Sequence, residues 1–158
     1  MRLTNKLQYD ERGAALLEMA VITPVLVILA AGLFEFGRIL YQHQLIETGV
    51  RDAARYLSRR PTPAADETAA KELAVMGAIG GTTRRVSWWT TSNVTITYPT
   101  VANPIDGATG ERTYRGPDPI KMVRVTTSAT YSGIGMLAAI GLSSPTIGYF
   151  HEERVIGE

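Results

Sequence analysis

The chain has 158 residues and carries 16 Lys and Arg against 15 Asp and Glu, a net charge of +1. This length fits one domain, or a small domain with an anchor, and the charge balance excludes a strongly basic nucleic-acid-binding protein. The absence of cysteine excludes a disulfide scaffold, a thiol enzyme and a cysteine-ligated metal site. The two histidines, His43 and His151, are too few for a histidine-rich metal site.

Apolar residues are concentrated near the N-terminus. Residues 14–34 read AALLEMAVITPVLVILAAGLF and contain a single charged side chain, Glu18. About 20 apolar residues, at 1.5 Å each, match the ~30 Å hydrocarbon core of a bilayer. A buried helix of a small soluble domain would need a polar face, which this run lacks. We therefore predict that residues 14–34 form a transmembrane helix.

The flanking charges predict the orientation of this helix. Arg2, Lys6 and Arg12 precede it, whereas the nearest basic residue beyond it is Arg38. Because basic flanks tend to stay in the cytoplasm, we expect a cytoplasmic N-terminus and a chain that lies mostly outside. Two other interpretations remain open: a plain signal anchor, and a secretory signal cleaved near the small residues 30–32.

Glu18 is the most informative residue of the run. A carboxylate within a membrane span costs about 2.5–3.5 kcal/mol on insertion scales and usually has a partner. One interpretation is that Glu18 reaches the nearby interface. In the other, cleavage after Gly13 makes Ala14 the N-terminus and Glu18 the fifth residue. The new amine, from the same chain or a neighbouring parallel helix, would then offset the cost of burying the carboxylate.

The helical pattern continues beyond the run. Spacings of three and four define a seam of Phe36, Ile39, His43, Ile46, Val50, Ala53 and Leu57. We therefore predict one helix over residues 14–60, about 70 Å long, which Pro61 stops. Its amphipathic part, residues 35–60, would pack along a folded domain or along other subunits. We interpret His43 as a packed, hydrogen-bonded residue of this seam and not as a ligand.

Three motifs along this helix resemble those of a known family. The run RGAALLE (residues 12–18) resembles the processing site of type IV prepilin-like proteins. Together with EFGR (35–38) and GVRDAARY (49–56), it makes residues 12–57 similar to the N-terminal domain of TadE-like proteins, the minor pseudopilins of tight-adherence (Flp) pilus systems. The resemblance covers under a third of the chain.

This resemblance implies a single-pass protein of the bacterial inner membrane, with the leader 1–13 in the cytoplasm. It implies processing between Gly13 and Ala14 by a prepilin peptidase. The expected partners are the lipid bilayer, other pilin-like subunits, which Glu18 would engage during assembly, and the pilus assembly machinery. Nucleic acid is not an expected partner.

The remaining residues, 61–158, predict a periplasmic α+β domain. Thr62 and Pro63 begin a short helix that reaches about Ala78 and ends at Gly80 and Gly81. Residues rich in β-branched and aromatic side chains predict strands at 86–89, 94–98, 122–131 and 146–155, with a loop at 99–119 and a short helix within 133–142. The predicted fold class is therefore α+β: a long N-terminal helix followed by a small, mostly antiparallel sheet, as in pilin-like subunits.

The sequence contains no nucleotide-binding loop, esterase or zinc-protease motif. We expect neither an enzyme nor a cofactor. Asp106, Glu111 and Asp118 offer oxygens for calcium but lack EF-hand spacing, so a polar turn is preferred. The leading hypothesis is a membrane-anchored minor pseudopilin. The alternative is a signal-anchored binding module that is not processed at Gly13, and a hydrolase dependent on His43 or His151 has little support.

Overall fold

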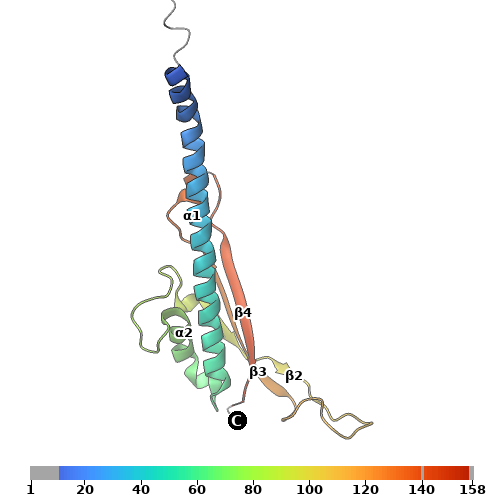
Figure 1. The fold of residues 1–158 in the computed structure, drawn as a ribbon. Helices are drawn as coiled ribbons and strands as arrows, with labels where there is room; N and C mark the ends of the chain where they lie inside the picture. The colour runs from blue at the N-terminus through green and yellow to red at the C-terminus, as the bar shows by residue number, and fades with distance from the viewer. Residues whose placement is uncertain (1–10, 140, 157–158) are drawn as a thin grey trace, which may run out of the picture.

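The computed structural model describes residues 11–139 and 141–156. One long helix, α1 (Glu11–Ser58), runs the length of the molecule, and a small domain packs against its C-terminal half (Figure 1). The predicted helix is confirmed, with both ends shifted: it begins three residues earlier than Ala14 and stops at Ser58. Residues 1–10 of the predicted leader lie outside the described residues.

A small antiparallel sheet forms the centre of the domain. Its middle strand, β3 (Ile120–Thr130), pairs with β4 (Thr146–Arg154) along one edge. Along the other edge it pairs with β1 (Val94–Thr97) and then β2 (Thr100–Val101) in one continuous register. The α+β plan and the strands predicted at 94–98, 122–131 and 146–155 are thereby confirmed.

Two predicted elements differ from the structure. Residues 86–89 form a turn and not a strand, although Val86 and Trp89 are buried. This segment crosses from the helical layer to the sheet, so its large side chains fill the core without strand pairing. The short helix is a turn of 3₁₀ helix (η1, Pro63–Asp66) followed by α2 (Glu67–Met76). It ends at Gly77, whose φ of 77° suits glycine, and not at Gly80 and Gly81.

Smaller elements complete the chain. A turn of 3₁₀ helix, η2 (Thr91–Asn93), leads into β1, and one turn of helix, α3 (Met136–Ala139), lies between β3 and β4. The predicted loop at 99–119 contains β2 and a single bridge between Ile105 and Arg112.

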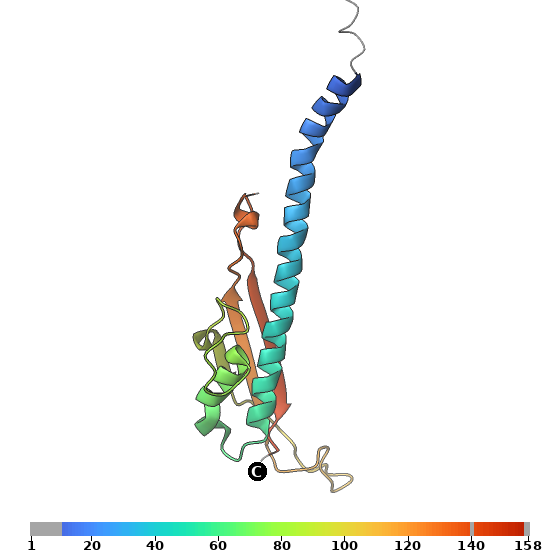
Figure 2. The same ribbon diagram turned by 60° about the vertical axis from the view of Figure 1, so that its left-hand side comes forward.

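The core lies between the C-terminal half of α1, α2 and the sheet (Figure 2). Gly49 allows α1 to approach α2 closely, since a Cβ there would collide with the carbonyl oxygen of Ala74 and lie 2.8 Å from the Trp89 ring. Fully buried apolar side chains from all three layers fill the centre, among them Ile46, Val50, Ala53, Leu57, Ala70, Ala74, Val75, Trp89, Val123 and Val125. The buried apolar surface therefore holds only the C-terminal half of α1 to the domain.

The structure buries the predicted seam of α1 against the domain at its C-terminal end but not at its start. Ile46, Val50, Ala53 and Leu57 are fully buried, Ile39 is half-buried, and His43 is half-buried with its ring edge-on to Tyr149. Phe36, however, is 58% exposed, and Glu35 occupies the buried position with 1% exposure. A straight helix drifts about 20° per heptad from an ideal 3.5-residue repeat. Three heptads before Leu57, this drift of about 60° has moved the buried face to the preceding residue.

Candidate membrane and assembly interface

The N-terminal half of α1 is an uncovered apolar surface. Its large apolar side chains are exposed: Leu16, Leu17, Met19, Val21, Ile22, Val25, Leu26, Val27, Ile28, Leu29, Leu33 and Phe34. Among residues 11–139 and 141–156, α1 is the one helix long and apolar enough to cross a membrane, a criterion that a signal sequence also meets. An apolar surface this large is unfavourable in water. The structure is consistent with a single-pass membrane protein.

The predicted processing and assembly residues lie on this uncovered half. Gly13 and Ala14 are exposed in the first turn of α1, and Glu18 is exposed one turn further on. No hydrogen bond or ion pair joins Glu18 to a described residue. Pro24 lies within the helix, which curves in this half (Figure 2), as the loss of one backbone hydrogen bond allows.

Glu35 follows the apolar run directly and is buried against the domain. The hydroxyl of Tyr131 donates a hydrogen bond of 2.9 Å to Glu35 Oε1, while Oε2 has no partner among the described residues. Gly133 covers the pair, and a Cβ there would collide with both side chains. We call these three residues the Glu35 cluster. They join α1 to the segment that follows β3.

The environment of the cluster keeps Tyr131 protonated. Burial raises the pKa of Tyr131, and its hydrogen bond to the Glu35 carboxylate raises that pKa further. A phenol whose neutral form is favoured remains a hydrogen-bond donor. The Tyr131 hydroxyl therefore remains the donor to Glu35 within a largely apolar surface.

Sequence reasoning did not assign a role to Glu35. It belongs to the EFGR motif, but its partner lies 96 residues away in the chain. One local signal was available: Glu35 precedes Ile39 by four residues, which places both on the same helical face. A charge on the buried face of a helix indicates a buried partner.

Further polar contacts fix the rotation of α1 against the domain. Asp52 binds Arg85 with an N–O distance of 2.6 Å. The indole Nε1 of Trp88 donates to Gln42 Oε1 at 3.1 Å, and its ring lies edge-on to Tyr131 with 5.9 Å between ring centroids. Together with the Glu35 cluster, these contacts hold one face of α1 toward the domain from its middle to its C-terminal end.

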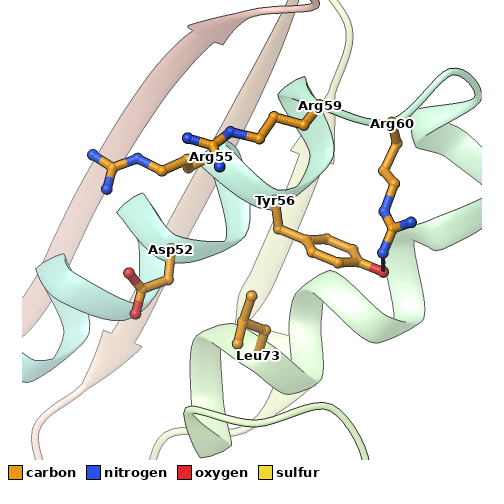
Figure 3. Close-up of a pocket in the computed structure, with 6 residues that line it drawn as sticks. All are labelled: Asp52, Arg55, Tyr56, Arg59, Arg60 and Leu73. Atoms are coloured by element: carbon orange, nitrogen blue, oxygen red, sulfur yellow. Dashed lines mark hydrogen bonds between the residues drawn. The ribbon is translucent and has the colours of Figure 1, made fainter. Parts of the chain in front are cut away.

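The far end of α1 carries a shallow groove (Figure 3). Its lining consists of Asp52, Arg55, Tyr56, Arg59, Arg60 and Leu73. Arg60 donates a hydrogen bond of 2.7 Å to the Tyr56 hydroxyl and lies 4.4 Å from the centre of its ring. Arg55 and Arg59 are exposed and extend on the other side of the helix (Figure 3). The groove is an open, basic surface lined by one carboxylate, and it pairs no nucleophile with a base.

The candidate calcium residues serve as turn residues. Asp106 accepts hydrogen bonds from the backbone N–H groups of Ala108 (2.7 Å) and Thr109 (3.3 Å). Asp118 accepts from the backbone N–H of Asn103 at 2.8 Å. Within residues 11–139 and 141–156, no group of three or more His, Asp or Glu side chains is placed to hold a metal ion. His151 Nε2 lies 3.1 Å from Glu153 Oε1.

No curated protein and no solved structure matches this chain. Residues 13–55 match a family model described as TadE-like protein. The matched segment contains the uncovered apolar half of α1, Glu18, Glu35 and the close-packed Gly49. This match and the apolar helix fit a membrane protein associated with tight-adherence pili. Over these residues, the long N-terminal helix is similar to the TadE-like family.

Proposed function

We propose that this chain is a membrane-anchored minor pseudopilin that assembles with other pilin-like subunits in tight-adherence (Flp) pilus biogenesis or secretion. One observation carries the proposal: α1 is a 48-residue helix in which residues 14–34 are largely uncovered, apolar and interrupted by a single carboxylate. That carboxylate, Glu18, is the fifth residue after Gly13. An uncovered apolar helix that carries one charged residue, Glu18, is suited to lateral packing against other helices in a membrane.

In this proposal the leader stays in the cytoplasm and the domain lies in the periplasm. A prepilin peptidase cuts after Gly13, and Ala14 then carries a free amine near the membrane surface. Glu18 of one subunit pairs with the amine of its neighbour, which offsets the cost of a carboxylate in lipid and sets the register of the two helices. The chain acts as a structural subunit and not as an enzyme, and neither nucleic acid nor a cofactor takes part.

The processing step is tested by the mature N-terminus. The full chain is expressed in a bacterium with an active prepilin peptidase, and in a matched strain without it, and the intact mass is measured from purified membranes. We expect a start at Ala14 in the first strain and at Met1 in the second. An unprocessed chain in both strains, or a start at Leu33, would favour the binding module over the pseudopilin.

The assembly step is tested at Glu18. Glu18→Ala removes the counter-ion of the amine but leaves an apolar helix, so we expect normal insertion and processing with loss of assembled pili. Thr23→Ala is the matched control, because it changes an exposed polar residue of the same helix without removing a charge. Sheared pili and membrane-bound subunit are quantified for both variants. Normal piliation with Glu18→Ala would remove Glu18 from the mechanism.

A further inference from the structure

The connection between β3 and β4 extends beyond the sheet toward the N-terminus of α1 (Figures 1 and 2). We call the described residues of this connection, 133–139 with Gly141 and Leu142, the β3–β4 tip; it includes α3. Met136, Leu137 and Ala139 of the tip face Ile28, Ala31, Gly32 and Glu35 of α1 across a cavity of about 110 Å³. The tip therefore lies beside the end of the apolar run.

The β3–β4 tip carries no charge and exposes large apolar side chains. Residues 133–142 read GIGMLAAIGL, and the whole stretch from Val125 to Phe150 lacks Asp, Glu, Lys and Arg. Ile134 is 62% exposed and Leu142 is 56% exposed. The nearest charges on the two strands, Arg124 and Glu152, pair with each other about 20 Å before the end of β3. Such a tip is poorly suited to water.

The contacts of the tip define its depth in a bilayer. If residues 14–34 cross the hydrocarbon core, Ile28 lies about 9 Å inside the boundary on the domain side, at 1.5 Å per residue. The tip residues that face Ile28 then lie within the hydrocarbon of the leaflet on the domain side, near its boundary with the headgroups. Segments that lie on a membrane bury their apolar side chains to about this depth, 5–10 Å.

Part of the backbone of the tip is hydrogen-bonded within the tip. Leu142 N–H donates to the carbonyl of Leu137 (2.8 Å), and Gly141 N–H donates to that of Ala138 (3.1 Å). This pair of bonds, with Gly141 at a φ of 77°, is a Schellman cap. Unpaired backbone groups cost several kcal/mol each in lipid, so a capped turn tolerates that environment better than an open loop.

The base of the tip carries the groups expected at a membrane surface. Tyr131 presents an apolar ring and a polar hydroxyl, a combination typical of the interface between lipid and water. Its bond to Glu35 holds the tip against α1 at the end of the apolar run. The first basic side chain of α1 beyond the run, Arg38, follows Glu35 by three residues and is exposed.

We propose that the β3–β4 tip inserts into the bilayer leaflet on the domain side, beside the end of α1. The domain is then held to the membrane at two points, which restricts its rotation about the axis of α1. This insertion goes beyond the pseudopilin role, since it requires a spanning helix but no processing at Gly13.

The absence of cysteine allows a direct measurement of depth. Single-cysteine variants of the full chain are labelled with a polarity-sensitive nitrobenzoxadiazole dye and placed, one chain per disc, in nanodiscs of phosphatidylethanolamine and phosphatidylglycerol. Ala138→Cys reports on the tip, Val27→Cys on lipid and Thr109→Cys on water; all three positions are exposed in the structure. We expect Ala138→Cys to match Val27→Cys, with blue-shifted emission and several-fold weaker quenching by iodide than Thr109→Cys.

Quenching of Ala138→Cys equal to that of Thr109→Cys would overturn insertion. Leu142→Cys gives a second measurement of the tip, with the same expectation, if the Ala138 variant does not fold. The measurement is repeated in vesicles that hold many chains. Weak iodide quenching in these vesicles but not in single-chain nanodiscs would show that the tip contacts protein, which also overturns insertion. An N-terminus at Met1 would remove the pseudopilin role and leave this result unchanged, so the two proposals fail separately.

Discussion

Two carboxylates on α1 differ in their surroundings. Glu18 is exposed on an apolar surface with no partner among the described residues, whereas Glu35 is buried with one oxygen bonded to Tyr131 and the other unpaired. A buried, half-satisfied charge stabilises a fold weakly, because desolvation opposes the hydrogen bond. Glu35 therefore contributes mainly through the geometry of its hydrogen bond, which holds the β3–β4 tip to α1.

Substitution of Glu35 separates its charge from its hydrogen bond. Glu35→Gln keeps an acceptor for Tyr131 and removes the buried charge, so we expect the free energy of unfolding to stay the same or to rise. Glu35→Ala leaves the Tyr131 hydroxyl unpaired, and we expect a loss of about 1–3 kcal/mol. Unfolding in mild detergent is followed through the combined fluorescence of Trp88 and Trp89, with the exposed Glu111→Gln as a control. A loss with glutamine as large as with alanine would show that the charge itself is needed.

At the scale of elements, the sequence predicts the helices and strands whose periodicity lies within their own segment. The periodicity of α1, β1, β3 and β4 is encoded within each segment, and so is the bare apolar run with Glu18. Residues 86–89 mislead because buried apolar side chains look alike in a strand and in a turn. Trp89 reaches the sheet through its side chain, which donates to Thr127 at 2.9 Å, and not through its backbone.

The rest of the interface depends on residues that meet only in the folded chain. Tyr131 and Gly133 reach Glu35 because β3 runs back along α1. The sequence near Glu35 indicates a buried partner but does not identify it. The exposure of Phe36 has a similar origin, since a heptad written along the sequence does not include the drift of a straight helix. The candidate site could therefore be predicted in its membrane half but not where it joins the domain.

Two glycines of α1 are expected to respond with opposite signs. At Gly37 a Cβ meets nothing within 4 Å, so Gly37→Ala should raise the free energy of unfolding by about 0.5–1 kcal/mol through helix propensity. At Gly49 the same methyl group collides with the Ala74 backbone, so Gly49→Ala should lower it by about 1–3 kcal/mol. Urea unfolding of both variants in the same detergent gives the comparison. Stabilisation by Gly49→Ala would mean that α1 and α2 pack less closely than described here.

At the scale of the whole molecule, one continuous helix joins a half suited to lipid and a half suited to water. The domain half has an apolar core between α1, α2 and the sheet, whereas every residue of α1 from Gly13 to Ala30 is exposed. Apart from the bond lost at Pro24, the backbone hydrogen bonds of α1 resist bending, so the helix transmits the orientation of one half to the other. A subunit packed through its membrane half would therefore present its domain at a fixed angle.

This division predicts that the domain half folds without the membrane half. A fragment of residues 35–158 keeps the Glu35 cluster and every core residue, so we expect it to unfold cooperatively in detergent-free buffer. A fragment of residues 46–158 loses two half-buried apolar side chains, Ile39 and Leu45, and the hydrogen bonds that Glu35 and Gln42 accept. We expect its free energy of unfolding to be lower by about 3–6 kcal/mol. Circular dichroism in urea measures both. If the longer fragment were unfolded, residues 13–34 would have to stabilise the domain through contacts outside the core. The exposed apolar surface of α1 would then contribute to the fold as well as span the membrane.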